Sequence, residues 1–390
     1  VVNQQSDQFT GRFNATWTPK LHFTAQTLIY GSYSHGYKAG GANPPGAVLI
    51  QITPNDHFGD GLNPIHPLTF KPEFIDAFEV GTKNSLLDGT LTLNADIFYF
   101  NYENYQISEI VDRSAINLNF DAHVKGAEVE GTWEPIPGLR FNFAGGWEDT
   151  ALAKGAKAVD LMDRSAGNSD WIVYKPSVTQ ASNCVAPLYA VLAAAKTVGN
   201  PAFSCDEAYL AHLDTVTDLP FVPNPTVDRD GTPLSNYGLT DYPGFDPVSS
   251  NATNGGAGPV PNKGQGFDKD LTHNELPNAP PFTISAGAQY SVPLTVDWAG
   301  TIRADYYWQD YSWARVFNDN PYDRLRGYTN VNLSLIFTSQ GGWQVMLYDK
   351  NIFNTTDITG AFLNSDDTGL TTNVFLTDPK LIGIRVTKNW

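Results

Sequence analysis

Apolar and polar residues alternate with a period of two along most of the chain, and this pattern limits the possible folds more than any other feature. Successive side chains of a β-strand point to opposite faces, so the alternation predicts strands with one apolar and one polar face. In the clearest segment the apolar or small residues are Phe282, Ile284, Ala286, Ala288 and Tyr290, and the residues between them are Thr283, Ser285, Gly287 and Gln289. The longest apolar stretch, 185–195, is too short for a membrane-spanning helix, which needs about 20 residues.

Eleven segments carry this strand pattern, and the connections between them alternate strictly between short and long. The segments are 6–18, 23–38, 73–86, 90–104, 121–133, 138–149, 282–291, 300–312, 327–338, 342–350 and 380–390. The long connections are 39–72, 105–120, 150–281, 313–326 and 351–379. Alternate connections of an up-and-down antiparallel sheet lie at the same end, so one end of the sheet has only short turns and the other has only long connections. Bacterial outer-membrane barrels have short turns at one end and long loops at the other.

The aromatic residues agree with a barrel in a membrane. Several lie near the predicted strand ends, on or beside the apolar face: Trp17, Trp133, Trp147, Tyr290, Trp308, Phe337, Trp343 and Trp390. Such rings form girdles at the two membrane–water boundaries. Polar residues such as Asp96 and Asn332 lie in the middle of strands on the other face, which predicts a polar interior and an apolar exterior.

The chain is acidic, and its charge excludes some functions. It has 24 Lys and Arg residues against 41 Asp and Glu residues, a formal net charge of −17. Nucleic-acid-binding proteins need a basic surface to neutralise phosphates, so nucleic acid is not expected as a partner.

The strand count predicts that the chain is part of a larger barrel. Single-chain bacterial barrels have even strand numbers, and eleven is half of the roughly 22 strands of plugged outer-membrane transporters. The sequence begins at Val1 and shows no signal peptide, which agrees with a piece of a longer protein. The predicted fold is therefore all-β: an antiparallel up-and-down transmembrane β-barrel, of which about 11 of 22 strands are in this chain.

The connection 150–281 differs from the rest because it contains Gly/Pro/Asn-rich stretches and patches of helical propensity. We interpret it as one large extracellular loop, with an inserted soluble domain as the alternative. It holds both cysteines, Cys184 and Cys205. They are either two unrelated thiols or a disulfide that closes a surface loop, which would imply an oxidising compartment.

Several short motifs resemble those of TonB-dependent outer-membrane receptors. They are Gly36-Tyr37-Lys38-Ala39-Gly40-Gly41, Lys71-Pro72-Glu73, Phe78-Glu79-Val80-Gly81-Thr82-Lys83, Leu87-Asp88-Gly89, Phe98-Tyr99-Phe100-Asn101-Tyr102, Val124-Lys125-Gly126-Ala127-Glu128, Asp349-Lys350-Asn351-Ile352-Phe353-Asn354 and Pro379-Lys380-Leu381-Ile382-Gly383-Ile384-Arg385-Val386. The Glu-x-Gly-x-Lys strand followed by the Asp-Gly turn is the most specific. Together the motifs cover nearly all of the chain except 150–281, so residues 1–390 resemble the C-terminal portion of the receptor barrel.

The resemblance implies a function and a location. It implies a receptor in the outer membrane of a Gram-negative bacterium that imports a scarce, bulky ligand, in the first place an iron–siderophore complex. Its expected partners are TonB of the inner-membrane energising complex, outer-membrane lipid with lipopolysaccharide, and the ligand itself. The chain departs from the family in ending on Trp390 rather than Phe, and the plug domain and the TonB box, both N-terminal in this family, are absent from it.

Family analogy places ligand contacts on the outer loops and the plug apex. The densest candidate set follows the polar face of one predicted strand and its end: Tyr307, Gln309, Tyr311, Trp313 and Arg315. Aromatic rings and one cation suit an anionic or catecholate ligand, which they would hold by stacking and charge-assisted hydrogen bonds. Rim aromatics and a loop-anchoring Arg are the alternative interpretation. No metal site is predicted. His57 and His66 share a loop with Asp56 and Asp60, and direct metal binding by this set is the less favoured interpretation. Asp228-Arg229-Asp230-Gly231 resembles part of a calcium loop, but the remaining ligand spacing fails.

No catalytic motif is present, and no enzyme activity or cofactor is predicted. The sequence has no His-Glu-x-x-His, no Gly-x-Ser-x-Gly and no phosphate-binding Gly-x-x-x-x-Gly-Lys. Two alternatives to the transporter stay open. One is a passive porin or small closed barrel, and the other is a secreted adhesin or lectin-like β protein that binds surfaces through 150–281.

Overall fold

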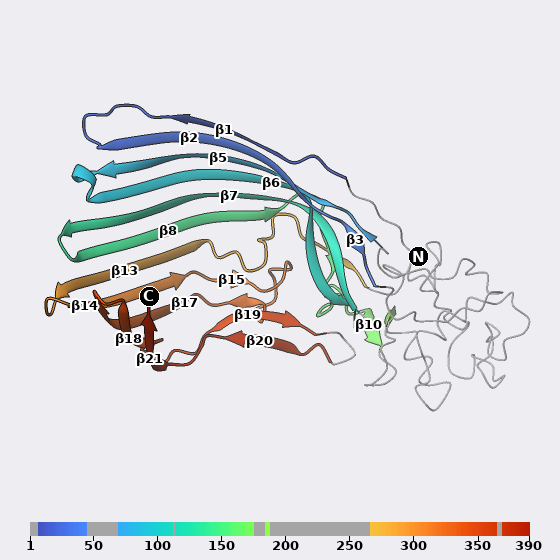
Figure 1. Cartoon of the computed structure of the whole chain (residues 1–390). Helices are drawn as coiled ribbons and strands as arrows, with labels where there is room; N and C mark the ends of the chain where they lie inside the picture. Colours follow the sequence, from blue (N-terminus) through green and yellow to red (C-terminus); the bar gives the residue numbers. More distant parts are fainter. Residues whose placement is uncertain (1–6, 45–68, 112–113, 175–183, 188–265, 365–368) are drawn as a thin grey trace, which may run out of the picture.

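The computed structural model describes residues 7–44, 69–111, 114–174, 184–187, 266–364 and 369–390. Its main element is one 11-stranded antiparallel sheet, in which every strand pairs with its neighbour along this series. The strands are β1 (Gly11–Trp17), β2 (Gln26–Lys38), β5 (Glu73–Leu86), β6 (Leu91–Val111), β7 (Ser114–Ile136), β8 (Leu139–Leu152), β13 (Phe282–Pro293), β14 (Trp298–Gln309), β17 (Tyr328–Ser339), β18 (Trp343–Lys350) and β21 (Leu381–Lys388). The predicted strands and their up-and-down order are thus confirmed (Figure 1).

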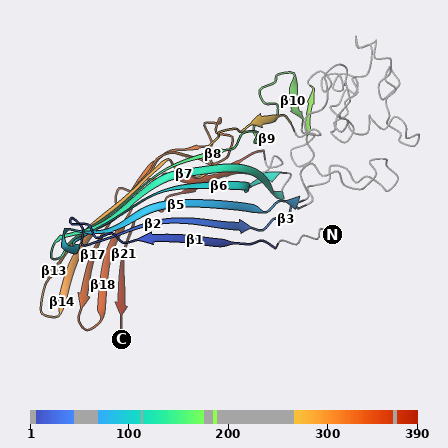
Figure 2. The same ribbon diagram turned by 90° about the horizontal axis from the view of Figure 1, so that it is seen from above.

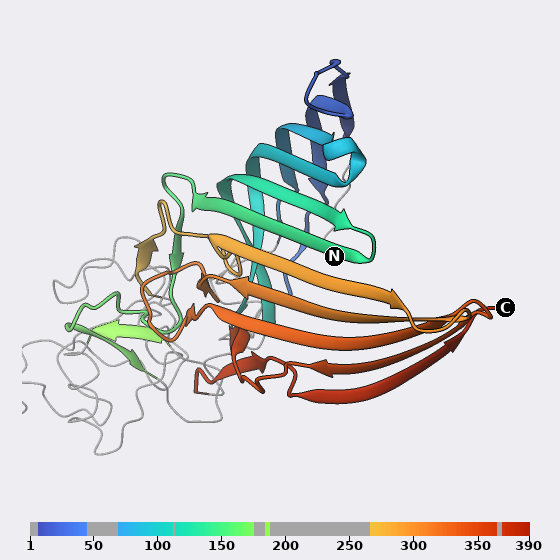
Figure 3. The ribbon, with the colours of Figure 1, turned by 90° about the vertical axis from the view of Figure 1, so that its left-hand side faces the viewer.

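The sheet curls across its width instead of lying flat (Figures 2 and 3). Within the described residues its two outermost strands, β1 and β21, do not pair with each other, so the wall is an open arc. No helix of the described part of the chain is long and apolar enough to cross a membrane.

The pairing register divides the strands into two faces of opposite character. Ile302 lies opposite Leu335, which lies opposite Leu347, and all three side chains are more than 40% exposed. The next position on each strand is polar, as with Arg303 opposite Ser334. The convex apolar face and the concave polar face are the reverse of a soluble barrel. This is the arrangement of a wall whose outside meets lipid and whose inside meets water.

Tryptophans mark the height of the apolar band. Trp298 and Trp308 lie at the two ends of the outer face of β14, ten residues apart. At about 3.3 Å per residue and a strand tilt near 40°, they are separated by about 25 Å along the barrel axis. That is the height of the apolar band in outer-membrane barrels, so the predicted girdle position of Trp308 fits the structure.

The prediction of a long connection at 105–120 is wrong, because β6 and β7 extend through these residues as one long hairpin. The two strands have 21 and 23 residues, about twice the length needed to cross a bilayer, so their ends project beyond it. A bulge between Tyr102 and Tyr105 interrupts the pairing. Asn104 occupies it with φ of +56°, and its backbone N–H donates to Asp121 Oδ1 at 2.9 Å. The bulge turns Tyr105 and Ile107 to the same face as Tyr102.

The other long connections contain small two-stranded sheets, all at the same end of the wall (Figure 1). They pair β3 (Gly41–Ala42) with β4 (Thr69–Phe70), β9 (Lys157–Val159) with β12 (Asp268–Asp270), β10 (Trp171–Tyr174) with β11 (Cys184–Pro187), β15 (Ser312–Trp313) with β16 (Arg324–Leu325), and β19 (Ile358–Leu363) with β20 (Thr372–Leu376). We call this the long-connection end. Cys205 lies outside the described residues, so the Cys184–Cys205 disulfide stays a prediction.

Glycines in the recognised motifs lie beneath aromatic rings of the neighbouring strand. The Tyr30 ring covers Gly81 of the Glu-x-Gly-x-Lys strand, and its hydroxyl donates to Glu79 Oε1 at 2.5 Å. Phe98 covers Gly126 in the same way, and Tyr348 covers Gly383. A Cβ at any of the three positions would overlap the ring above it, so close packing of the ring requires glycine there.

The Lys-Asn-Ile-Phe-Asn motif forms a turn held by its first asparagine. Asn351 is 2% exposed and has φ of +47°, a conformation that Asn tolerates better than most residues. Its side-chain amide donates to the carbonyl oxygens of Thr355 (2.8 Å) and Asp378 (2.9 Å), and its Oδ1 accepts from the Thr355 N–H at 3.0 Å. Asn351 therefore ties the end of β18 to the approach to β21.

We expect Asn351→Ala to lower the stability of the barrel by about 2–4 kcal/mol, because it leaves buried backbone groups unpaired. Asn373→Ala, at an exposed position of β20, is the matched control and should have no effect. The measurement is the temperature at which the detergent-solubilised receptor loses its heat-modifiable gel mobility. Equal midpoints for the two variants would contradict the structural role of Asn351.

Candidate ligand-binding site

The concave face carries a cluster of carboxylates near the middle of the strands. Glu79, Asp96, Glu128 and Glu130 lie on the neighbouring strands β5, β6 and β7 of this face. Together with Lys83 and Tyr307, three of them line a hollow of about 310 Å³ in the wall. The hollow is polar, and its charge is mainly negative.

The structure divides the five predicted ligand residues between two places. Tyr307 and Gln309 lie on the concave face of β14, where the Tyr307 hydroxyl donates to Gln309 Oε1 at 3.0 Å. The Tyr307 ring lies 6.0 Å from that of Tyr328 on β17. Both rings lie on the concave face of the wall.

Tyr311, Trp313 and Arg315 follow β14 into the long-connection end. The Tyr311 hydroxyl donates to Glu275 Oε1 at 2.9 Å, and the Arg324 guanidinium lies 4.3 Å from the centre of its ring. The backbone of Trp313 pairs with Arg324 in the β15–β16 sheet and bridges to Pro277. These residues hold loop segments together in this structure.

Arg315 belongs to a buried charge cluster that joins three loop segments, which we call the loop layer (153–165, 266–281 and 312–325). Its NH1 donates to Asp160 Oδ1 at 2.7 Å, and its NH2 donates to Asp323 Oδ2 at 2.6 Å. Asp160 is 1% exposed and also accepts from Lys269 Nζ at 3.1 Å. Lys269 in turn pairs with Asp163 and Asp319, at 3.1 Å and 2.7 Å. Two cations therefore face four carboxylates.

The pKa values of the cluster follow from this geometry. Burial works against ionisation of Asp160, but hydrogen bonds and attraction from Arg315 outweigh it and lower the pKa of the carboxyl. Burial also works against the charge of Lys269, yet the hydrogen bonds to Asp319, Asp163 and Asp160 raise its pKa. Both residues lie beyond the membrane-spanning part of the strands, and both stay charged at neutral pH.

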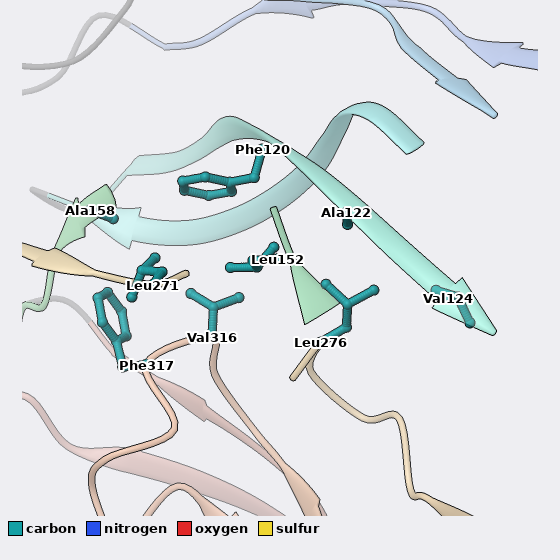
Figure 4. Packing of buried hydrophobic residues seen from close by; sticks show 9 residues of the cluster. All are labelled: Phe120, Ala122, Val124, Leu152, Ala158, Leu271, Leu276, Val316 and Phe317. Atoms are coloured by element: carbon teal, nitrogen blue, oxygen red, sulfur yellow. The ribbon is translucent and has the colours of Figure 1, made fainter. Parts of the chain in front are cut away.

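Beneath the charge cluster, the loop layer packs on the concave face through apolar side chains (Figure 4). Leu152, Leu271 and Val316 are nearly fully buried; Leu152 ends β8, Leu271 lies in the connection between β8 and β13, and Val316 lies in the connection between β14 and β17. They meet Phe120 and Val124 of β7. The loop layer is thus folded inward over the mouth of the wall, and an apolar cluster fixes its position.

The sequence pattern did not indicate Asp160, Lys269 or Asp323 as members of one cluster. Asp160 and Lys269 lie 109 residues apart in the connection between β8 and β13, and Asp323 lies in the connection between β14 and β17, so no local spacing joins them. The sequence shows only that the long connections contain charged residues, and this is typical of any solvated loop.

Among the described residues, no group of three His, Cys, Asp or Glu side chains is arranged to hold a metal ion. His57, His66, Asp56 and Asp60 lie outside the described residues, as does Asp228-Arg229-Asp230-Gly231.

An antiparallel up-and-down wall with an apolar convex face, a polar concave face and one elaborate end defines the class of outer-membrane β-barrels. The family described as "TonB dependent receptor-like, beta-barrel" matches residues 1–201. The chain belongs to this family of TonB-dependent receptor barrels, and such barrels lie in the outer membrane of Gram-negative bacteria. The described part of the chain contributes 11 strands to such a barrel.

Solved receptor structures are similar to the chain. The ferric yersiniabactin uptake receptor FyuA from Yersinia pestis matches with a TM-score of 0.53 and 14% identity, over 98% of this chain and 37% of that one. The siderophore receptor PiuA from Acinetobacter baumannii matches with a TM-score of 0.48 and 15% identity, over 97% and 35%. The chain thus spans about a third of the length of these receptors. No curated protein matches its sequence.

Proposed function

We propose that the chain is the C-terminal portion of a TonB-dependent receptor that imports an iron–siderophore complex. The observation that carries the proposal is the match of residues 1–201 to the TonB-dependent receptor barrel family, and the loop layer folded over a polar concave wall agrees with a receptor that holds a ligand at its mouth. The structures FyuA and PiuA, which share this fold, are receptors for ferric yersiniabactin and for a siderophore.

Under this proposal the long-connection end faces the outside of the cell, and 150–281 is an extracellular loop. Ligand reaches the loop layer first and then the rings of Tyr307 and Tyr328. The apolar convex face contacts membrane lipid, and Lys125, paired with Asp149 at 3.0 Å above the apolar band, lies at the level of lipopolysaccharide. The chain acts as a transporter wall and not as an enzyme.

The proposal assigns the remaining family parts to the rest of the receptor. TonB of the inner-membrane energising complex is the expected partner, through a TonB box, and a plug domain is expected inside the wall. This division follows from the family, whose members are longer than this chain.

Uptake of iron-55 tests the proposal. We expect a strain that lacks the whole gene to lose uptake of at least one ferric complex from a panel of hydroxamate, catecholate and mixed-ligand siderophores. Uptake should return with the full-length gene and should disappear again when tonB is deleted. Normal uptake of all panel members by the deletion strain, together with loss of cobalamin or maltodextrin uptake, would replace the iron ligand by another nutrient. Diffusion of small solutes that is independent of tonB would instead indicate a porin.

A further inference from the structure

A cavity of about 460 Å³ lies at the long-connection end, apart from the hollow in the middle of the wall. Its sides come from the projecting part of β6, from residues 314–317 of the loop layer and from β19. Most of the lining is apolar, including Ile107, Val316 and Phe362. A cavity of this size and lining suits a small ligand or one part of a larger ligand.

Glu109 is the one carboxylate in this lining. It follows Tyr105 and Ile107 on the face that the β6 bulge turns inward. Within the described residues its carboxyl group makes no hydrogen bond and no ion pair, and an unpaired carboxylate in an apolar cavity is costly. A bound partner that supplies positive charge or N–H donors would remove that cost.

Arg315, the other charged residue in the lining, attracts Glu109 but makes no ion pair with it. Its guanidinium already donates to Asp160 and to both carboxylate oxygens of Asp323. Asp160 and Asp323 together place two carboxylates on the one guanidinium of Arg315, which offsets its attraction for a negative ligand. The anionic ligand expected for Arg315 from sequence would find this cation already engaged.

We propose that the cavity binds a positively charged nitrogen of an amphipathic ligand, with Glu109 as its counter-ion and Ile107, Val316 and Phe362 against its apolar body. The inference rests on the proposed function, since the occupant is the group that the imported ligand presents to the loop layer. The inference specifies the chemical class of the ligand: it carries an amine or guanidine in addition to its iron-chelating groups.

The ionisation of Glu109 agrees with this role. Burial raises the pKa of its carboxyl group to about 7, Arg315 works in the opposite direction, and Asp160 adds to the increase. Tyr105 is the other titratable group in the lining, and burial raises the pKa of its hydroxyl, so it stays neutral. A cation binds the ionised form of Glu109, so its affinity should rise between pH 6 and pH 8.

The test uses the full-length receptor in detergent and two probes with the same ring and opposite charge, tyramine and 3-(4-hydroxyphenyl)propionate, observed by ligand NMR. We expect tyramine to bind and the propionate to bind at least tenfold more weakly. Glu109→Gln should weaken tyramine binding about tenfold at pH 8 and should remove its pH dependence. Glu103→Gln, at an exposed position of the same strand, is the matched control and should leave both unchanged.

A second variant checks the position of the probe. Ala361→Phe, on the β19 side of the cavity, fills the space and should abolish tyramine binding while the heat-modifiable mobility of the receptor is retained. Equal binding of the two probes, unchanged tyramine affinity in Glu109→Gln, or unchanged affinity in Ala361→Phe would each overturn the proposal. Failure of the proposed function is distinguishable, since iron uptake would then be absent from the wild-type receptor while its tyramine binding persists.

Discussion

Replacement of Asp160 by Ala should release the loop layer from the wall. Removing the buried carboxylate from this network costs up to about 3–5 kcal/mol, although Arg315 keeps Asp323 and Lys269 keeps Asp163 and Asp319. Here Arg315 and Lys269 both lose a partner, and neither is exposed enough to be rehydrated without movement. We expect amide hydrogen exchange in residues 153–165 and 312–325 to become at least 100-fold faster, while exchange in β13 and β14 is unchanged.

Two comparisons make this result specific. Asp170→Ala changes an exposed carboxylate of the same connection, directly before β10, and should leave the exchange rates at their wild-type values. Protection of the loop layer against hydrogen exchange should also fall at low pH. Because the folded-state pKa of Asp160 lies below its ordinary value, its stabilisation is present above about pH 4 and is lost as the pH falls through the folded-state pKa. Unchanged exchange in Asp160→Ala would show that the apolar cluster alone holds the layer.

Replacement of Gly126 by Ala should prevent assembly of the barrel. A Cβ at this position would overlap the Phe98 ring and the backbone carbonyl of Trp147, and the carbonyl cannot move without breaking the β7–β8 pairing. We expect loss of about 3 kcal/mol or more, enough to deplete the folded receptor from the outer membrane. The measurement is the folded fraction on an unheated gel.

Gly145 on β8 is the matched control. A Cβ there would be 3.8 Å from its nearest neighbours, so Gly145→Ala should assemble normally. If Gly126→Ala assembles as well as Gly145→Ala, the ring above Gly126 has room to move, and the packing reason for the motif glycine is wrong.

The strand framework was predictable from the sequence because its cause is local. A strand with lipid on one side and water on the other must alternate along its whole length, as at residues 282–290. Tight turns such as Leu87-Asp88-Gly89 fix where strands end, since Asp88 and Gly89 both adopt positive φ there. The order of the strands then follows, because short turns join neighbours.

The candidate site was predictable only in part. Alternation placed Tyr307 and Gln309 on the concave face, and the structure agrees. It also extended the same face to Arg315, but the strand ends at Gln309, and beyond it the direction of each side chain depends on its tertiary contacts. The bulge at Asn104 turns Glu109 inward, and no periodic pattern in the sequence predicts this bulge.

The sequence by itself thus determined the fold class, the two faces of the wall and the number of strands, since each follows from the period of two and from turn residues. Only the tertiary structure decided what the long connections do. Asp160, Lys269 and Arg315 meet because three segments of two long connections fold inward onto one apolar cluster. Contacts between residues more than 100 positions apart depend on how the whole wall brings its ends together, and no local pattern of residues carries that information.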